Sequence, residues 1–419
     1  MRERSCGCET SRVTARTQEL ESPYAWARLT ASLGLMTLGG VGMYAAAVAL
    51  PAIQAEFAVT RSEASLPYTV TMIGFGFGGI LMGRLADRFG VMVPVLIGIV
   101  ALGLGFVLAG LAPGLVTFSI AQCLLIGALG NAATFVPLVA DASFWFDRRR
   151  GIAVAICASG NYLAGALWPP VLQHFFEVVG WRQTFIGVGI FSIVAMLPLA
   201  FMLRRRPPAF TAPAPSLRTA HPSAQPLGFS PGALQAILCL AGLACCVAMS
   251  MPQVHIVAYC GDLGFGPARG AEMLSLMLGC GIVSRLASGW VCDHIGGLRT
   301  LLLGSMLQGV ALALFLFFDG LVSLYVISAL FGLFQGGIVP SYAIIVREYF
   351  TPREAGARVG FVLMATLFGM ALGGWMSGVV FDLTGSYRAA FLNGIGWNVL
   401  NLAIATALFY RSKRRYAFV

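Results

Sequence analysis

Long apolar stretches alternate with short polar segments along the whole chain. Each stretch has roughly 20 to 28 residues, the length that an α-helix needs to cross about 30 Å of hydrocarbon. The strict alternation of apolar and polar positions that is typical of membrane-spanning β-strands is missing from them. The pattern predicts an all-α polytopic membrane protein with twelve transmembrane helices. The predicted helices are 28–54, 65–86, 90–111, 115–141, 151–174, 182–203, 232–259, 268–291, 298–318, 321–348, 357–382 and 387–410.

One polar segment near the middle of the chain differs from the other connections. Residues 205–231 are rich in proline, alanine and serine, a composition typical of a linker. The linker separates two blocks of six predicted helices. The predicted organisation is a tail at 1–25, a six-helix bundle at 26–204, the linker, a second six-helix bundle at 232–411 and a tail at 412–419.

The two halves of the chain repeat the same features in the same order. Asp87 in "GRLADRFG" corresponds to Asp293 in "GWVCDHIGG", and Arg182 in "GWRQTF" corresponds to Arg388 in "GSYRAAF". Both pairs are 206 positions apart. Because each half holds an even number of helices, the halves have the same orientation in the membrane. The sequence therefore predicts a parallel repeat about an axis along the membrane normal.

The charges agree with a membrane protein and predict its orientation. Only 11% of the residues are charged, against about 25% in soluble domains. The connections on one side hold most of the arginines, whereas the other side holds only Arg61, Arg182, Arg269 and Arg388. Basic connections face the cytoplasm, so both tails and the linker are expected there and the protein is expected in the cell membrane. The net charge of +10 then serves orientation and lipid contact rather than binding of nucleic acid.

The repeated motif identifies a family resemblance. A six-plus-six chain with Gly-x-x-x-Asp-Arg-x-Gly between its second and third helices, echoed between the eighth and ninth, resembles the major facilitator superfamily. The resemblance implies two six-helix bundles that rock around a central site, with this loop as a gate and a monomer as the functional unit. The residues expected to form the gate are Gly83, Arg84, Asp87, Arg88, Gly90 and Asp293.

A narrower resemblance concerns the substrate. The segments "SFWFDRRRGIAVAICASG", "GWRQTF" and "SRLASGWVCDHIGG" are similar to the monocarboxylate and oxalate/formate branch of that family. This branch moves small organic anions, often with a proton, and typically has an arginine in its eighth helix, where Arg285 falls. The chain departs from the animal carriers at Ala52 and Gly281, where they have lysine and aspartate, so substrate and coupling do not carry over in detail.

Arg285 is the cation expected inside a predicted helix. It lies eight residues before Asp293, about 12 Å from the cytoplasmic loop and near the membrane midplane. Its counterpart in the first half is Gly79, so the scaffold does not require a charge there. An arginine fork matches a carboxylate, and a single buried cation favours a monoanion. The alternative is a side chain that snorkels to the cytoplasmic face or pairs with a structural partner.

Other polar residues are candidates for the cavity wall or for proton coupling. Amides and phenols in mid-helix can orient a small anion, although such side chains also serve plain helix packing. A titrating group at the periplasmic ends of helices 7 and 8 could carry the proton, or could instead be a turn or packing residue. The cavity candidates are Tyr44, Gln122, Asn131, Asn161, Tyr162, Gln335 and Tyr342, and the coupling candidates are His255 and Asp262.

Three functions remain open at this point. The chain lacks a nucleotide-binding loop, a zinc-hydrolase motif and a nucleophile elbow, so we expect no enzyme activity and no cofactor. The favoured function is a secondary carrier of a small monocarboxylate with protons. A proton-driven exporter of drugs or other small molecules is the alternative, although such exporters commonly carry an acidic residue within the first helix. A non-transporting sensor on a carrier scaffold is the remote third.

Overall fold

The computed structural model describes residues 20–146, 149–205 and 226–416. The described part is helical and contains 12 helices long and apolar enough to cross a membrane, which confirms the predicted number. These spans are Pro23–Phe57, Arg61–Phe89, Met92–Gly110, Leu115–Trp145, Gly151–Val179, Trp181–Phe201, Pro231–Asp262, Pro267–Ile295, Gly297–Phe317, Leu321–Tyr349, Glu354–Thr384 and Tyr387–Lys413.

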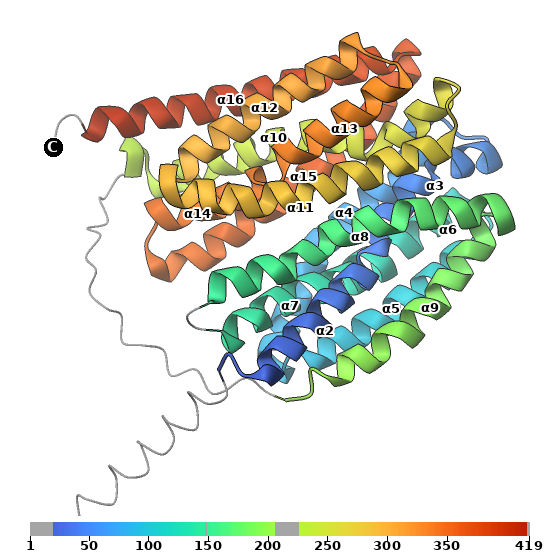
Figure 1. Cartoon of the computed structure of the whole chain (residues 1–419), viewed down its shortest axis with the longest axis horizontal. Coiled ribbons are helices and arrows are strands. Elements are labelled where there is room, and N and C mark those ends of the chain that lie inside the picture. Colours follow the sequence, from blue (N-terminus) through green and yellow to red (C-terminus); the bar gives the residue numbers. More distant parts are fainter. Residues whose placement is uncertain (1–19, 147–148, 206–225, 417–419) are drawn as a thin grey trace, which may run out of the picture.

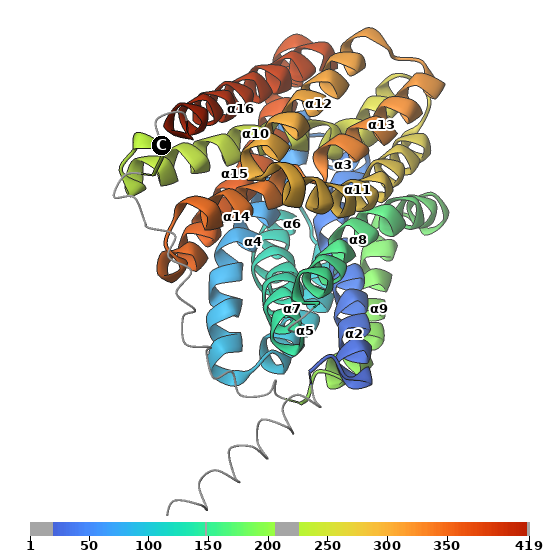
Figure 2. The same cartoon turned by 60° about the vertical axis from the view of Figure 1, so that its left-hand side comes forward.

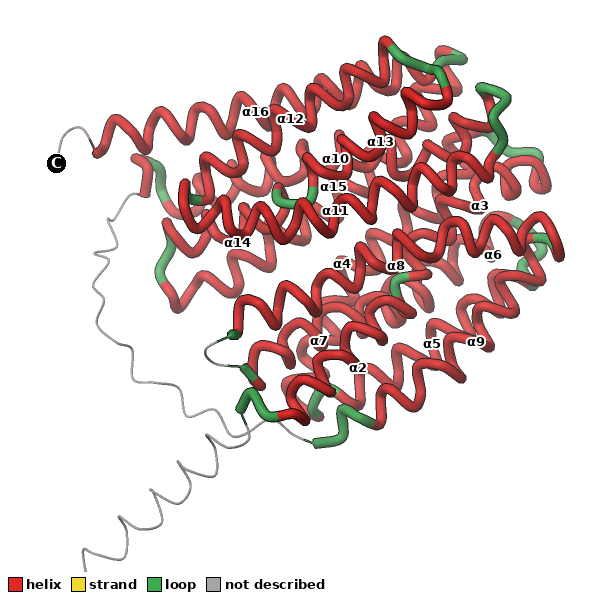
Figure 3. Tube along the Cα trace, in the orientation of Figure 1, coloured by secondary structure: helices red, strands yellow, loops and turns green. Residues whose placement is uncertain are grey.

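The spans form two six-helix bundles, which occupy the lower and upper halves of Figure 1; their helices are red and their connections and breaks green in Figure 3. The N-terminal bundle contains α2 (Pro23–Gly39), α3 (Val41–Phe57), α4 (Arg61–Phe89), α5 (Met92–Gly110), α6 (Leu115–Ile120), the π-helix η1 (Ala121–Asn131), α7 (Ala132–Trp145), α8 (Arg150–Val179) and α9 (Trp181–Phe201). After η2 (Pro226–Gly228), the C-terminal bundle contains α10 (Pro231–Asp262), α11 (Pro267–Ile295), α12 (Gly297–Phe317), α13 (Leu321–Gln335), α14 (Ile338–Tyr349), α15 (Pro352–Thr384) and α16 (Tyr387–Tyr416).

The local sequence accounts for the ends of the repeated helices. At the start of α4 the Thr60 side chain and Glu63 form a capping box, which satisfies backbone N–H groups that have no intrahelical partner. The same helix ends at Gly90 with φ of 85°, and α11 ends at its repeat counterpart Gly296 with φ of 83°. Other residues rarely adopt this left-handed conformation, which explains the glycine that closes both copies of the motif.

The two bundles touch mainly along two pairs of helices, α4 with α15 and α8 with α11, with a smaller contact of α3 with α10. Thr69 donates a hydrogen bond to the carbonyl of Ala371 at 3.1 Å, and Ser275 donates to the carbonyl of Ala166. Figures 1 and 2 show the bundles together at one end and diverging toward the end where α2 begins and α16 ends. We name the joined end the Arg61 end, and the diverging end, which holds the loop after α4, the basic end.

Three spans are interrupted near their middle. The first breaks between α2 and α3 at Gly40, the fourth changes from a π-helix to an α-helix at Asn131, and the tenth breaks between α13 and α14. Such interruptions expose backbone groups that must find partners inside the protein, and they frequently mark functional sites.

A buried ion pair that the sequence did not reveal lies inside the N-terminal bundle. The Arg28 Nε and Nη2 atoms donate to Asp141 at 2.7 and 2.9 Å, and the guanidinium covers the ring of Trp145. The predicted helix limits placed Arg28 and Asp141 at the ends of their spans. The structure extends the first span back to Pro23 and the fourth on to Trp145, so both charges are enclosed, with 1% and 4% of their surface exposed.

Replacing Asp141 with asparagine is expected to lower the free energy of unfolding by about 3 kcal/mol, because Arg28 would stay buried without its counter-charge. Thermal unfolding of the purified protein in detergent measures this loss. The double variant Arg28→Met with Asp141→Leu should recover most of the stability, since it removes both charges. Equal stability of wild type and Asp141→Asn would contradict a structural role for the pair.

Candidate functional site

Arg285 on α11 contacts α8 of the other bundle. It lies ten residues from Ile295, about 15 Å from the basic end of α11. Its Nη1 donates to the carbonyl of Ala158 at 3.1 Å, and its guanidinium lies 4.8 Å from the ring centroid of Tyr162. The α8 helix therefore holds the guanidinium in a fixed plane.

The charge of Arg285 has no counter-ion among the described residues. The ion pairs in that part of the chain join other residues, and the buried Nε of Arg285 has no hydrogen-bond partner there. The partners that the structure gives it, the Ala158 carbonyl and the Tyr162 ring, carry no charge, and the alternatives of a structural partner and of a snorkelling side chain stay predictions. A half-buried guanidinium with one nitrogen held by a backbone carbonyl and another free can still accept an anion.

The interruption of the tenth span packs directly against the backbone of Arg285. Gly336 donates its N–H to the Ser284 hydroxyl at 3.1 Å, and a Cβ at Gly336 would lie only 2.9 Å from the Arg285 nitrogen. Only glycine permits this approach. This close approach brings Gln335 next to the same turn of α11. The side-chain oxygen of Gln335 accepts a hydrogen bond from Gln253 at 3.0 Å, and the buried Nε2 of Gln335 has no partner among the described residues.

Two predicted cavity tyrosines belong to the same region. Tyr162 stacks under Arg285, and the Tyr44 hydroxyl donates to the backbone carbonyl of Asn161 at 3.3 Å. Both phenols lie close enough to Arg285 to interact electrostatically with its positive charge. The structure therefore brings Tyr44, Tyr162 and Arg285 together from three spans, whereas Gln335 approaches them only through the backbone of its neighbour Gly336.

Asn131 and Gln122 have other partners. With its amide oriented to satisfy both atoms, Asn131 donates to the carbonyl of Gly39 at 3.0 Å and accepts from the N–H of Met43 at 3.3 Å. It thus caps the interruption between α2 and α3 while also lining a cavity beside it. Gln122 accepts a hydrogen bond from Thr71 at 3.2 Å inside the N-terminal bundle.

Tyr342 lies away from Arg285, inside the C-terminal bundle. Its hydroxyl donates to Asn401 at 2.7 Å, and Asn401 in turn donates to Ser305 at 2.7 Å. The tyrosine is fully buried, so this chain joins α14, α16 and α12 as a packing network. The predicted place of Tyr342 in the cavity wall has no support in these contacts.

Both coupling candidates, His255 and Asp262, lie on the last turns of α10, at the Arg61 end. Asp262 accepts from Arg61 Nη2 at 3.1 Å, an ion pair between the bundles, and so it does not pair with Arg285. Arg61 Nη1 donates to the Tyr387 hydroxyl at 2.8 Å, and that hydroxyl lies 3.1 Å from His255 Nδ1. His255 Nε2 lies 2.8 Å from the carbonyl of Gly374.

The known roles of its donors and acceptors determine which atoms of this network carry hydrogen. A carbonyl only accepts, so His255 Nε2 carries hydrogen; an arginine only donates, so the Tyr387 hydroxyl is free to donate to His255 Nδ1. The imidazole is then neutral and both of its nitrogens are bonded. Asp382 strengthens the same junction, because its carboxylate accepts from the N–H groups of Arg61 and Ser62 at 2.9 and 2.8 Å.

The predicted gate residues lie at the basic end. Arg84, Asp87, Arg88 and Asp293 are exposed, and among the described residues none of these four bonds to the opposite bundle. Gly83 and Gly90 are half-buried within their own bundle. The motif is therefore not engaged in this structure, in agreement with the divergence of the bundles at that end.

The comparisons identify the family. The sequence profile of the Major Facilitator Superfamily matches residues 32–326 and 238–418, and the chain belongs to this family. Its fold is similar to that of a bacterial homologue of the human lysosomal transporter Spinster in an inward-facing and occupied conformation. The TM-score is 0.70 at 16% identity, over 94% of this chain and 98% of that one.

Two relatives have names that state a class of substrate. The chain is 30% identical to monocarboxylate transporter 13 of Bos taurus over 327 residues, which cover 75% of this chain and 73% of the relative. It is 26% identical to monocarboxylate transporter 11 of Mus musculus, over 74% of this chain and 70% of the relative. The family and these relatives are transporters, so the chain is a membrane transporter and not an enzyme.

Proposed function

We propose that the chain is a secondary transporter that carries a monocarboxylate across the cell membrane by alternating access, coupled to protons and working as a monomer. The proposal of a negatively charged substrate rests on one observation: Arg285 lies in mid-span without a carboxylate partner among the described residues. An unpaired charge at this depth is costly and usually functional. The names of two relatives, monocarboxylate transporters 13 and 11, support the same class.

The donors around Arg285 favour a carboxylate with one charge. The guanidinium is oriented by the Ala158 carbonyl and the Tyr162 ring, and its Nε is unpaired. The free amide nitrogen of Gln335 offers a neutral donor nearby. One cation with neutral donors balances one negative charge, whereas a dianion would leave a second charge uncompensated in hydrocarbon.

Alternating access would be controlled at the two ends of the molecule. The Arg61–Asp262 pair and the Asp382 contacts hold the Arg61 end shut, while the motif at the basic end is unbonded. With the basic end facing the cytoplasm, this arrangement corresponds to an inward-open state. In the opposite state the motif would close and the Arg61 junction would part.

His255 is the group best placed to couple this junction to protons. Neutral imidazole satisfies both of its neighbours, whereas a protonated ring would place a second positive charge next to Arg61 and oblige the Tyr387 hydroxyl to turn. Protonation therefore favours parting of the junction. The charged or titratable groups around the junction are Arg61 on α4, Tyr259 and Asp262 on α10, Asp382 on α15 and Tyr387 on α16, with Asp319 and Arg388 beyond Tyr259.

Uptake by reconstituted vesicles tests this function. Labelled lactate, pyruvate, formate and oxalate are offered with and without a pH gradient, and monoanions are expected to accumulate only with the gradient. Preference for oxalate would contradict the single-charge site. If none of these acids accumulates or competes, the carboxylate carrier is wrong, and proton-driven export of an unrelated compound becomes the function to test.

Asp87→Asn is expected to lower the transport rate about tenfold, the value of one hydrogen bond to a charged group, without changing the order of substrate preference. Asp87 is exposed and unbonded here, so its contribution belongs to the closed state of the basic end. Uptake rates for two acids measure both quantities, with exposed Asp319→Asn at the other end as the control. A shifted preference at a normal rate would place Asp87 in substrate binding instead.

A further inference from the structure

Each half of the chain places a carboxylate, an aromatic hydrogen-bond donor and an arginine at the Arg61 end. In the first half they form what we call the Glu56 group: Glu56 near the end of α3, with Trp181 and Arg182, the first two residues of α9. The residues 206 positions later form the Asp262 group: Asp262, the last residue of α10, with Tyr387 and Arg388, the first two residues of α16. The internal repeat therefore makes the two groups equivalent, member by member.

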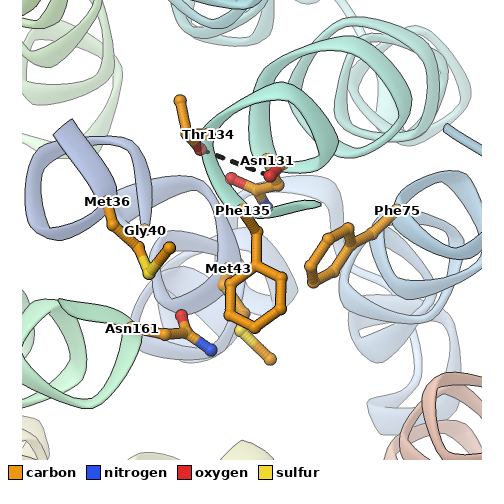
Figure 4. Close-up of a pocket in the computed structure, with 8 residues that line it drawn as sticks. All are labelled: Met36, Gly40, Met43, Phe75, Asn131, Thr134, Phe135 and Asn161. Carbon is orange, nitrogen blue, oxygen red and sulfur yellow. Dashed lines mark hydrogen bonds between the residues drawn. The ribbon is translucent and has the colours of Figure 1, made fainter. Parts of the chain in front are cut away.

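The Glu56 group is closed within the N-terminal bundle. The Glu56 carboxylate accepts hydrogen bonds from the ring N–H of Trp181 and from Arg182 Nε, the latter at 2.6 Å. The break of the first span at Gly40, which lines the cavity drawn in Figure 4, lies well before Glu56, and α3 is continuous over Val41–Phe57. The carboxylate is thus held by the two donors that start α9 and by no residue of the other bundle in the described part of the chain.

The Asp262 group is open, and its carboxylate binds the other bundle instead. Asp262 accepts from Arg61 Nη2 at 3.1 Å, and the Tyr387 hydroxyl accepts from Arg61 Nη1 at 2.8 Å. Arg388 is exposed and forms no ion pair with a described residue. Its charge is close to the same cluster, because it interacts electrostatically with Tyr259, whose ring centroid lies 5.3 Å from that of Tyr387. Arg61 thus occupies the place on Asp262 that the repeat assigns to Arg388.

Arg61 has no equivalent in the second half of the chain. The residue 206 positions after it is Pro267, at the start of α11. Glu56 therefore has one arginine in its group and no competitor from the other bundle, whereas Asp262 has two arginines available. Withdrawal of Arg61 would leave Asp262 as a half-buried carboxylate without a counter-charge, which is costly unless Arg388 replaces it.

We propose that Asp262 exchanges its partner during transport. It binds Arg61 while the Arg61 end is shut, and when that end parts it binds Arg388 and the Tyr387 hydroxyl, so that the Asp262 group closes as the Glu56 group is closed. Arg388 is then a positioning residue that stabilises the parted state. This inference rests on the proposed function, since it uses the opposite state of alternating access, and it adds the contact that holds this state.

Distances between the bundles, measured on the full chain in lipid nanodiscs, test the exchange. Spin labels carried by unnatural amino acids at Val116 and Leu383, exposed residues at the Arg61 end of the two bundles, give the ratio of parted to shut molecules with pyruvate at mildly acidic pH. Arg388→Gln is expected to lower this ratio about fivefold, the upper end for a partly exposed ion pair. Asp319→Asn, which removes another carboxylate near Tyr259, is the control and should change the ratio less than twofold.

An Asp262→Asn background separates the exchange from a general effect of Arg388. Asparagine forms neither ion pair, so Arg388→Gln should change the ratio less than twofold in this background. A fivefold fall in both backgrounds, or an unchanged ratio in Arg388→Gln alone, would overturn the exchange while the carrier function stands. If the wild type shows no parted molecules with or without pyruvate, alternating access at the Arg61 end fails, and the proposed function fails with it.

Discussion

Arg285→Gln is expected to reduce monocarboxylate transport by about 30- to 150-fold. Hydrogen bonds to a charged partner contribute about 2 to 3 kcal/mol, and this substitution removes the charge while leaving an amide of similar reach. The Ala158 carbonyl and the Tyr162 ring would remain in place, so the loss reports on the anion rather than on the fold. Initial uptake rates over a range of substrate concentrations measure it.

Two companion variants make the result interpretable. Arg285→Lys keeps the charge but loses the planar fork and the stacking on Tyr162, so it should fall between wild type and glutamine. Arg299→Gln removes an exposed arginine from α12 and should transport normally. Wild-type affinity in Arg285→Gln would show that the anion binds elsewhere and that the arginine only packs against α8.

His255→Gln is expected to abolish proton-driven accumulation while leaving exchange of substrate across the membrane intact. Glutamine can donate to the Gly374 carbonyl and accept from Tyr387, as the neutral imidazole does, but it cannot take up a proton. Wild type should accumulate a monoanion about tenfold for each unit of pH difference, the free energy of one proton moving down that gradient. The variant should stop at equal concentrations on both sides.

The control for this variant is His174→Gln, which changes an exposed histidine on α8 and should accumulate substrate as wild type does. Counterflow, in which unlabelled substrate inside exchanges for label outside without a pH gradient, shows whether the variant still moves its substrate. Tenfold accumulation by His255→Gln would exclude this histidine as the coupling group and turn attention to Asp262, which forms an ion pair with Arg61 across the bundles.

The sequence predicted the parts of the fold that depend on local composition. Twelve apolar stretches of sufficient length require twelve membrane helices, and the repeated aspartates predicted the two equivalent bundles. The repeat also indicated that the charge of Arg285 is not required by the scaffold, because Gly79 occupies the equivalent position in the first half. Gly90 and Gly296 terminate equivalent helices in the same left-handed conformation, a backbone requirement of the repeated motif that its spacing did not reveal.

Contacts between distant residues could not be predicted in this way. Arg28 and Asp141 are 113 positions apart, and each looked like an ordinary charge at the end of a span. Arg61 looked like one of four arginines in the less basic connections, yet it joins α4 to α10 across 201 positions. With 51 glycines in the chain, the interruptions of the first and tenth spans also had no distinct signature. These features follow from three-dimensional packing, which a one-dimensional pattern does not contain.

The most direct test of the central claim is binding of a monocarboxylate and of its uncharged amide to purified protein. Isothermal titration of wild type and Arg285→Gln in lipid nanodiscs, with pyruvate and the corresponding amide, separates the contribution of charge from that of shape. We expect wild type to bind the acid at least 30-fold more tightly than the amide, and Arg285→Gln to show no such difference. Equal binding of acid and amide to wild type, or an undiminished preference for the acid in the variant, would contradict it.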